Sequence, residues 1–286
     1  MRSWTTAAVI VAVWAVPIHA QSLNDLLDRM GAYLNTYEGE LSQIIADERY
    51  DQREYGRDPL ARLRTVREKR LDSEVAFLRL PGNGYWYGFR SVRMVDKKLL
   101  KPPAPKLADF LSTATDLDTQ HALMMAASSA HNLGMQRTLN MPTVPLAVVQ
   151  ASNRELIAFR DGGTESVGRV KTRRISFDEI GESTLIRHMN RFSVKTRGQV
   201  WVEPDTGRVW RVEIDCRDPG DQHGGDLAGN FTVRVEFVMH KALEMLVPSE
   251  MIETFPATVA RGEGRATYRN FRRFQTSARI ITPPPR

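Results

Sequence analysis

The sequence has very little cysteine. Cys216 is the one cysteine among 286 residues. A single cysteine excludes an intrachain disulfide and every metal site built from paired cysteines. A chain of this length does not need a disulfide, because it can bury a sizeable core. Cys216 ends an alternating apolar series with Val212 and Ile214, which predicts a small buried side chain and not a reactive thiol.

The short motifs of catalysis and nucleotide binding are also absent. The sequence contains no G-x-S-x-G, S-x-x-K or H-E-x-x-H, and no glycine-rich phosphate loop before a helix. We therefore expect a protein that is not an enzyme, with no catalytic residues and no cofactor. A hydrolase whose site is dispersed over distant strands is the alternative, and the sequence nominates no residues for it.

Neither sign of charge dominates. The chain carries 40 basic and 34 acidic residues, which gives a net charge of +6 at pH 7. The basic residues are scattered as single positions in alternating segments, which is typical of solvated strand faces. This pattern argues against a nucleic-acid groove, whereas peripheral contact with an anionic membrane surface stays open.

Residues 215–226 form a polar cluster with oxygen, sulfur and imidazole groups, the types of side chain that bind metals. Its spacing matches neither an EF-hand loop, which ends in a bidentate glutamate, nor a tetrahedral zinc site. Pro219 and four glycines between residues 220 and 229 instead predict a flexible loop. We therefore expect no metal site. Residues 160–163, Arg-Asp-Gly-Gly, predict a turn for the same reason.

Long hydrophobic runs are missing except near the N-terminus. Arg2 precedes the uncharged apolar residues 7–16, and Ala20 offers a small residue for cleavage. A membrane-spanning helix needs about 20 apolar residues, so residues 1–20 predict a secretory signal peptide cleaved after Ala20. An uncleaved anchor is the alternative. We expect residues 21–286 to be periplasmic or secreted and to form a single domain, with a helical insertion near residues 106–150.

Periodicity outlines the elements of this domain. Apolar residues at helical spacing predict helices over residues 23–34 and 107–125. Residues 44–55 predict a strand, and the charged residues 57–70 predict an exposed loop. After residue 155 the chain alternates almost continuously, which predicts mainly strands.

The strongest signal lies in residues 199–214. Residues 204–207, Pro-Asp-Thr-Gly, supply turn chemistry between two alternating segments and predict a β-hairpin. Apolar and charged residues alternate here and again after residue 230, as a one-sided antiparallel sheet requires. We expect the apolar face to line a ligand site, formed by Val200, Val202, Trp210, Val212, Ile214, Phe231, Val233, Val235 and Phe237.

This hairpin, W-V-E-P-D-T-G-R-V-W-R-V-E from Trp201 to Glu213, resembles a segment of the periplasmic outer-membrane lipoprotein carriers. The order of helices and strands is similar to that of these carriers and of the related sensor domain that restrains envelope-stress signalling. Residues 264–271 also resemble the end of exported bacterial proteins of unassigned role. The resemblance implies an α+β fold: a curved antiparallel β-sheet, an incomplete barrel, covered by helices.

Two binding functions follow from this fold. In the first, a lipid or an acylated protein lies in a cavity between the sheet and the helices, and each buried methylene contributes about 0.8 kcal/mol. In the second, the interior is filled and the chain is a non-catalytic scaffold module that binds an envelope protein, with Trp86, Trp201 and Trp210 as anchors. The alternation itself does not separate them, because the same pattern builds a hollow or a filled interior.

Overall fold

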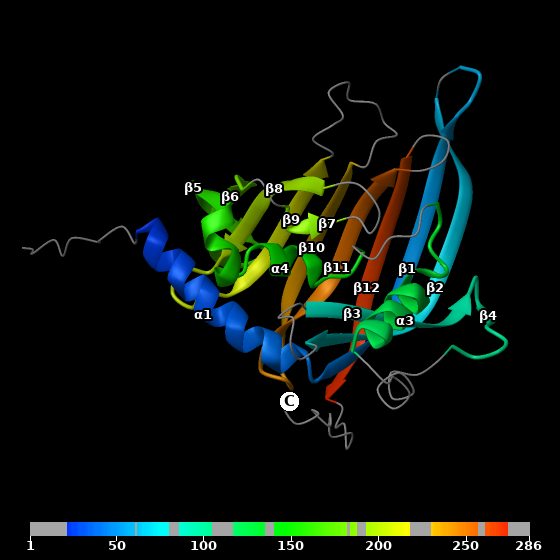
Figure 1. Ribbon diagram of the computed structural model, residues 1–286, viewed down its shortest axis with the longest axis horizontal. Coiled ribbons are helices and arrows are strands. Elements are labelled where there is room, and N and C mark those ends of the chain that lie inside the picture. Colours follow the sequence, from blue (N-terminus) through cyan, green and yellow to red (C-terminus); the bar gives the residue numbers. More distant parts are fainter. Residues whose placement is uncertain are drawn as a thin grey trace, which may run out of the picture.

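The computed structural model describes residues 22–60, 62–79, 86–104, 117–134, 140–181, 184–187, 193–217, 230–256 and 261–273. These residues form one large, curved antiparallel sheet with a few helices packed against it (Figure 1). The predicted α+β fold class is therefore confirmed. The predicted signal peptide and most of the 215–226 cluster lie outside the described residues.

The sheet has the strand order β4-β3-β2-β1-β12-β11-β10-β9-β8-β6-β5, and the short β7 pairs with β8. The order ends at β4 and β5, so the sheet is open, and its first and last long strands lie side by side in the middle. The strands are β1 (Ile44–Arg57), β2 (Leu63–Arg79), β3 (Trp86–Val95), β4 (Lys98–Leu99), β5 (Ile157–Val167), β6 (Val170–Glu179), β7 (Ile186–Arg187), β8 (Ser193–Val202), β9 (Val209–Arg217), β10 (Phe231–His240), β11 (Met245–Pro256) and β12 (Arg261–Arg273).

Helix α1 (Leu23–Leu41) covers the inner face of the sheet. It begins after Ser22, whose Oγ accepts a hydrogen bond from the backbone N–H of Asp25 at 3.1 Å. Such a cap contributes about 1 kcal/mol to helix stability. The predicted apolar stripe is buried against the sheet, with Leu26 and Leu34 completely inaccessible. The helix predicted over residues 23–34 is thus confirmed and extends to Leu41.

Three shorter helical segments follow in the chain: α3 (Leu117–Ser129), α4 (Val144–Val148) and the 3-10 helix η1 (Ala151–Leu156). Helix α4 packs with α1 into the main core on the inner face. Helix α3 lies on the other face, where Met124 contacts Ala76, Leu78 and Phe89 of β2 and β3. The described part of the predicted helix 107–125 is α3, and the rest lies outside the described residues. No helix in the described part of the chain is long and apolar enough to cross a membrane.

The hairpin predicted at residues 204–207 is confirmed as the β8–β9 connection. The backbone N–H of Glu203 donates to the carbonyl of Arg208 at 2.9 Å, and Gly207 adopts a φ of +74°. A β-carbon on Gly207 would lie 2.4 Å from the backbone oxygen of Arg29 in α1. Glycine is therefore required twice here, for the turn and for the close approach of α1.

Two predictions about local structure are wrong. Residues 57–70 are not a loop, because β1 continues to Arg57 and β2 begins at Leu63. The first part of β2 was not predicted because its side chains are charged and exposed. This part of the strand is stabilised by backbone pairing with β1 and not by burial. Residues 160–163 are not a turn either, since they lie within β5, where the register with β6 shifts between Asp161 and Thr164. Glycines in a strand often mark such an irregularity.

Candidate functional site

One row of facing residues runs across the inner face through eight strands. In order these residues are Ile175, Val200, Val212, Val235, Met251, Ala266, Tyr50 and Leu71. Every one of them has a relative exposure of 0%. The inner face is therefore continuous across the open sheet, and its middle is sealed from solvent.

The next row along the strands changes its chemistry halfway. Its residues are Phe177, Gly198, Ile214, Val233, Glu253, Gly264, Gln52 and Lys69. The row is apolar as far as Val233 on β10 and polar from Glu253 on β11 onward. Both Glu253 and Gln52 are buried. At this end of the inner face there is thus an apolar half on β6 to β10 and a polar half on β11, β12, β1 and β2, although the preceding row crosses the same four strands with the core residues Met251, Ala266, Tyr50 and Leu71.

The structure brings all nine predicted lining residues together on the apolar half. Seven are buried in the main core: Val200, Val202, Val212, Ile214, Val233, Val235 and Phe237. Trp210 and Phe231 are partly buried and pack against that core. Their common placement is established, whereas a ligand-binding role for them stays a prediction.

Trp210 is placed by an irregularity that the sequence pattern does not reveal. The register between β8 and β9 shifts between Trp201 and Val202, so Val202 faces Val209 and Trp201 faces Arg211. Val209 therefore enters the core together with Val212. The Arg211 guanidinium lies 5.0 Å from the ring centre of Trp201 on the other face. Trp201 and Trp86 are buried, so in this conformation neither is a surface anchor.

A segment of the chain itself packs on the inner face in the same core as α1. Eight of the ten residues 140–149 are buried, among them Leu146 and Val148 of α4. We call residues 140–149 the plug. Two prolines and β-branched residues make it a poor helix, which limits α4 to five residues. At this point the interior is filled by the chain's own apolar residues.

A buried ion pair lies at the start of the plug. Arg90 on β3 and Glu48 on β1 both have fully buried side chains, and Arg90 Nη2 lies 2.8 Å from Glu48 Oε1. The same Nη2 donates to the backbone oxygen of Asn140 at 2.9 Å. The side-chain amide of Asn140 donates to the hydroxyl of Tyr50 at 3.3 Å, and Tyr50 donates to Glu253. This network joins the plug to β3 and to two strands of the polar half, β1 and β11.

Electrostatics in this network favours a charged arginine. Burial alone disfavours the guanidinium charge of Arg90, but Glu48 outweighs it and holds the pKa of Arg90 above its usual value. Burial and the neighbouring Glu48 raise the pKa of Tyr268 far above its ordinary range. Tyr268 is therefore a neutral phenol.

Aromatic side chains of α1 form a second group at the edge of the plug. Tyr33 and Tyr37 stack with ring centres 5.3 Å apart, and Tyr37 meets Trp86 and Phe237 edge-on. The hydroxyls of both tyrosines and Nε1 of Trp86 are buried without a hydrogen-bond partner among the described residues. Burial raises the pKa of both tyrosines, so these groups are protonated donors. Three donors without acceptors are costly unless an oxygen-bearing group meets them.

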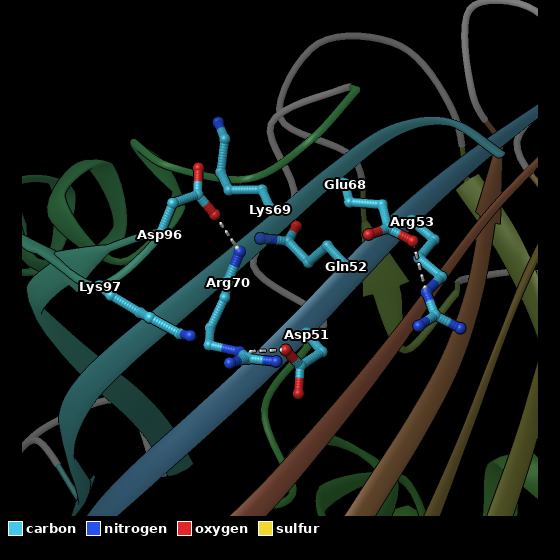
Figure 2. A pocket seen from close by; sticks show the side chains of 8 residues that line it. All are labelled: Asp51, Gln52, Arg53, Glu68, Lys69, Arg70, Asp96 and Lys97. Carbon is cyan, nitrogen blue, oxygen red and sulfur yellow. Dashed lines mark hydrogen bonds and ion pairs between the residues drawn. The ribbon is translucent and has the colours of Figure 1, made fainter.

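Two pockets on the β1–β2 side of the sheet are polar. The first has a volume of about 340 Å³ and lies between the paired strands and the turn after β3 (Figure 2). Its lining residues are Asp51, Gln52, Arg53, Glu68, Lys69, Arg70, Asp96 and Lys97. Arg70 pairs with Asp51 at 2.5 Å and Arg53 with Glu68 at 3.1 Å. Because the charges neutralise one another, this pocket has the character of an ordinary solvated strand face.

The second pocket, of about 330 Å³, has the same character, with arginines and aspartates side by side. Arg93 and Asp47 line this pocket, and Arg93 and Arg272 both pair with Asp47 and Glu74. No group of three or more potential metal-ligating side chains occurs in the described ranges. Cys216 is buried, and burial raises the pKa of its thiol to about 12, so it is inert at neutral pH.

The sequence reasoning missed the polar half of the inner face. Its residues, Glu48, Tyr50, Gln52 and Glu54, occupy every second position of β1 and are buried at every one of them. Polar residues at alternate positions normally indicate the solvated face, so this pattern reads as surface. The available signal was that the intervening residues, Asp47, Arg49, Asp51 and Arg53, are also charged. One of two polar faces had to point inward.

The sequence matches no protein-family model and no curated protein. Among solved structures, the chain is similar to a putative outer membrane lipoprotein-sorting protein domain from Vibrio parahaemolyticus, with 11% identity and a TM-score of 0.41. That similarity covers 87% of this chain and 94% of the other. A DUF1329 family protein from Desulfovibrio piger is similar with 14% identity and a TM-score of 0.35, over 89% of this chain and 92% of the other.

Proposed function

We propose that the chain is a non-catalytic cell-envelope protein that binds an amphipathic ligand, a lipid or the acyl group of an acylated protein, on the inner face of its sheet. The observation that carries the proposal is the division of this face between Val233 and Glu253, which are direct partners across β10 and β11. An apolar half next to a buried polar half suits a molecule with an acyl chain and an oxygen-bearing head.

The apolar half supplies the driving force. Each methylene that moves from water to a contact with residues such as Val200, Val212 and Val235 contributes about 0.8 kcal/mol. The plug packs in the same core as these residues. A ligand that replaces the plug exchanges one set of apolar contacts for another, so the cost of entry is moderate.

Three buried donors on α1 and β3 supply the selectivity. The hydroxyls of Tyr33 and Tyr37 and Nε1 of Trp86 are grouped around the ring of Tyr37. Ester, phosphate and carboxylate oxygens accept such hydrogen bonds. A ligand head that meets these donors therefore removes an energetic cost that the free protein bears.

Mass spectrometry of organic extracts from the purified residues 21–286 tests the proposal directly, with a delipidated sample as the control. We expect a bound lipid in the first sample, and we expect the delipidated protein to bind a dansylated fatty acid. A pair of isosteric variants on β10 locates the site. Val235→Thr places a hydroxyl on the buried inner face, whereas Val238→Thr places it on a side chain that is 45% exposed.

We expect Val235→Thr to weaken binding of the dansylated fatty acid about fivefold, since a buried hydroxyl costs about 1 kcal/mol or more. Val238→Thr should bind like the parent protein. Circular dichroism of both variants controls for folding. Extracts without lipid, together with a delipidated protein that does not bind the fatty acid, would refute the proposal.

A further inference from the structure

The β1–β2 hairpin extends beyond the rest of the sheet. Within the described residues, the pairing of β1 with β12 ends at Tyr55 and Arg261, and the pairing of β2 with β3 ends at Leu71 and Val95. The hairpin end, residues 56–60 and 62–64, therefore projects as a two-stranded ribbon, seen at the upper right of Figure 1, and residues 65–70 continue from it as the free edge of β2 beside β1. We call the described residues between 56 and 70 the ribbon.

The ribbon exposes large apolar side chains at its end. Leu60, Leu63 and Val66 have relative exposures of 71%, 49% and 40%. The described residues expose eight large hydrophobic side chains, and three of the eight lie within these seven positions. Single exposed apolar residues are ordinary, but a group at the tip of a projecting element indicates an interaction site.

The same segment carries an excess of basic residues. It has six basic residues against two acidic ones: Arg57, Arg62, Arg64, Arg67, Lys69 and Arg70 against Asp58 and Glu68. Arg67 and Arg70 pair with Glu54 and Asp51 of β1, so the net excess at the ribbon is smaller than this count. Arg62 pairs with Asp58 at 2.9 Å and remains 72% exposed. Its guanidinium can therefore reach a further anionic group without leaving Asp58.

An alternative explanation is that the basic residues protect an open strand edge, because arginine and lysine on an edge prevent pairing with other chains. This explains the basic residues only. It does not account for Leu60, Leu63 and Val66, which would promote such pairing. Apolar side chains interleaved with arginines at one protruding end match a different surface, the interface of an anionic lipid bilayer. There the arginines meet lipid phosphates and the apolar side chains enter the boundary between headgroups and acyl chains.

We propose that the ribbon docks this protein on anionic membranes through Leu60, Leu63 and Val66, with the surrounding arginines bound to lipid phosphates. This site lies outside the inner face of the sheet, so it is independent of the proposed ligand site. Docking at the ribbon leaves α1 and the plug free of the bilayer.

Vesicle flotation of residues 21–286 tests the proposal with phosphatidylglycerol–phosphatidylethanolamine vesicles and, for comparison, with phosphatidylcholine vesicles. We expect flotation with the anionic vesicles only, and less of it as salt is added. The triple variant Leu60→Ser, Leu63→Ser, Val66→Ser should bind at least about tenfold more weakly, because each apolar side chain loses its burial in the interface.

The matched control is Leu99→Ser, Ile180→Ser, Val238→Ser, whose parent side chains are 71%, 63% and 45% exposed elsewhere on the sheet. It should float like the parent protein. Arg62→Gln with Arg64→Gln should weaken binding by about fivefold for each charge removed, while Arg234→Gln with Arg265→Gln should change it little. The proposal is overturned if the parent protein does not float, or if the ribbon and control triples float equally.

Discussion

Arg90 Nη2 lies 2.8 Å from Glu48 Oε1 in a region where both side chains are completely buried. The pair links β3 to β1, two strands that are not neighbours in the sheet, and the same arginine binds the backbone of Asn140. One ion pair thus ties β3 to β1 across β2 and holds the first residue of the plug.

Removal of one partner of this pair should be strongly destabilising. Glu48→Gln leaves the guanidinium charge of Arg90 buried without its counter-charge, which costs about 3–5 kcal/mol. Urea unfolding followed by circular dichroism measures the loss. Glu68→Gln is the control, because its pair with Arg53 is 61% and 58% exposed and contributes about 1 kcal/mol at most. Equal losses in the two variants would contradict the assigned role of Arg90.

The contact between α1 and the β8–β9 turn depends on Gly207. Gly207→Ala combines a positive φ with a β-carbon that would lie 2.4 Å from the backbone oxygen of Arg29. We expect the free energy of unfolding to fall by about 2–3 kcal/mol. Gly163→Ala isolates the backbone contribution, since its φ is +81° but nothing lies within 4 Å of the added carbon. The free energy of unfolding of Gly163→Ala should fall by about 1 kcal/mol. Thermal unfolding compares the two variants.

The thiol of Cys216 should be unreactive in the folded protein. Burial raises its pKa to about 12, whereas an unfolded thiol has a pKa of about 8.5. Since the fold favours the neutral thiol, the stability it contributes is complete below about pH 8.5 and is lost as the pH rises toward 12. Labelling with Ellman's reagent at mildly alkaline pH should be slow without urea and rapid with it. Fast labelling of the native chain would show that Cys216 is accessible.

Removal of a tyrosine hydroxyl should have opposite effects on stability in the aromatic group of α1 and in the buried network around Arg90. Tyr37→Phe removes a hydroxyl without a partner among the described residues, so stability should stay the same or rise by about 1 kcal/mol. Tyr50→Phe removes a hydroxyl that donates to Glu253 and accepts from Asn140, and it should cost about 1–3 kcal/mol. Urea unfolding measures both variants. If the proposed function is right, Tyr37→Phe also weakens ligand binding.

Much of the sheet could be predicted from sequence, namely the elements whose buried face is apolar and whose exposed face is charged. The β8–β9 hairpin has an alternating apolar face and a Pro-Asp-Thr-Gly turn, and the structure contains it where it was predicted. The apolar stripe of α1 and the inner-face residues of β10 follow the same logic. In each case one face of the element is apolar and the other is charged.

The polar half could not be predicted, because no local pattern shows which of two polar faces is buried. Glu48 faces inward because Arg90, 42 residues away in the chain, compensates its charge. The strand between Leu63 and Arg70 was missed for a related reason. Its side chains carry no burial signal, and its conformation comes from backbone pairing with β1.

The place of β1 in the sheet has a consequence for how the molecule forms. Its two edges pair with β2, which follows directly, and with β12, which begins at Arg261. The central pairing therefore closes only after nearly the whole chain has been synthesised, and contacts between such distant segments form slowly. In a chain with this topology the β1–β12 pairing forms late in synthesis, and a variant truncated before β12 would expose one edge of β1.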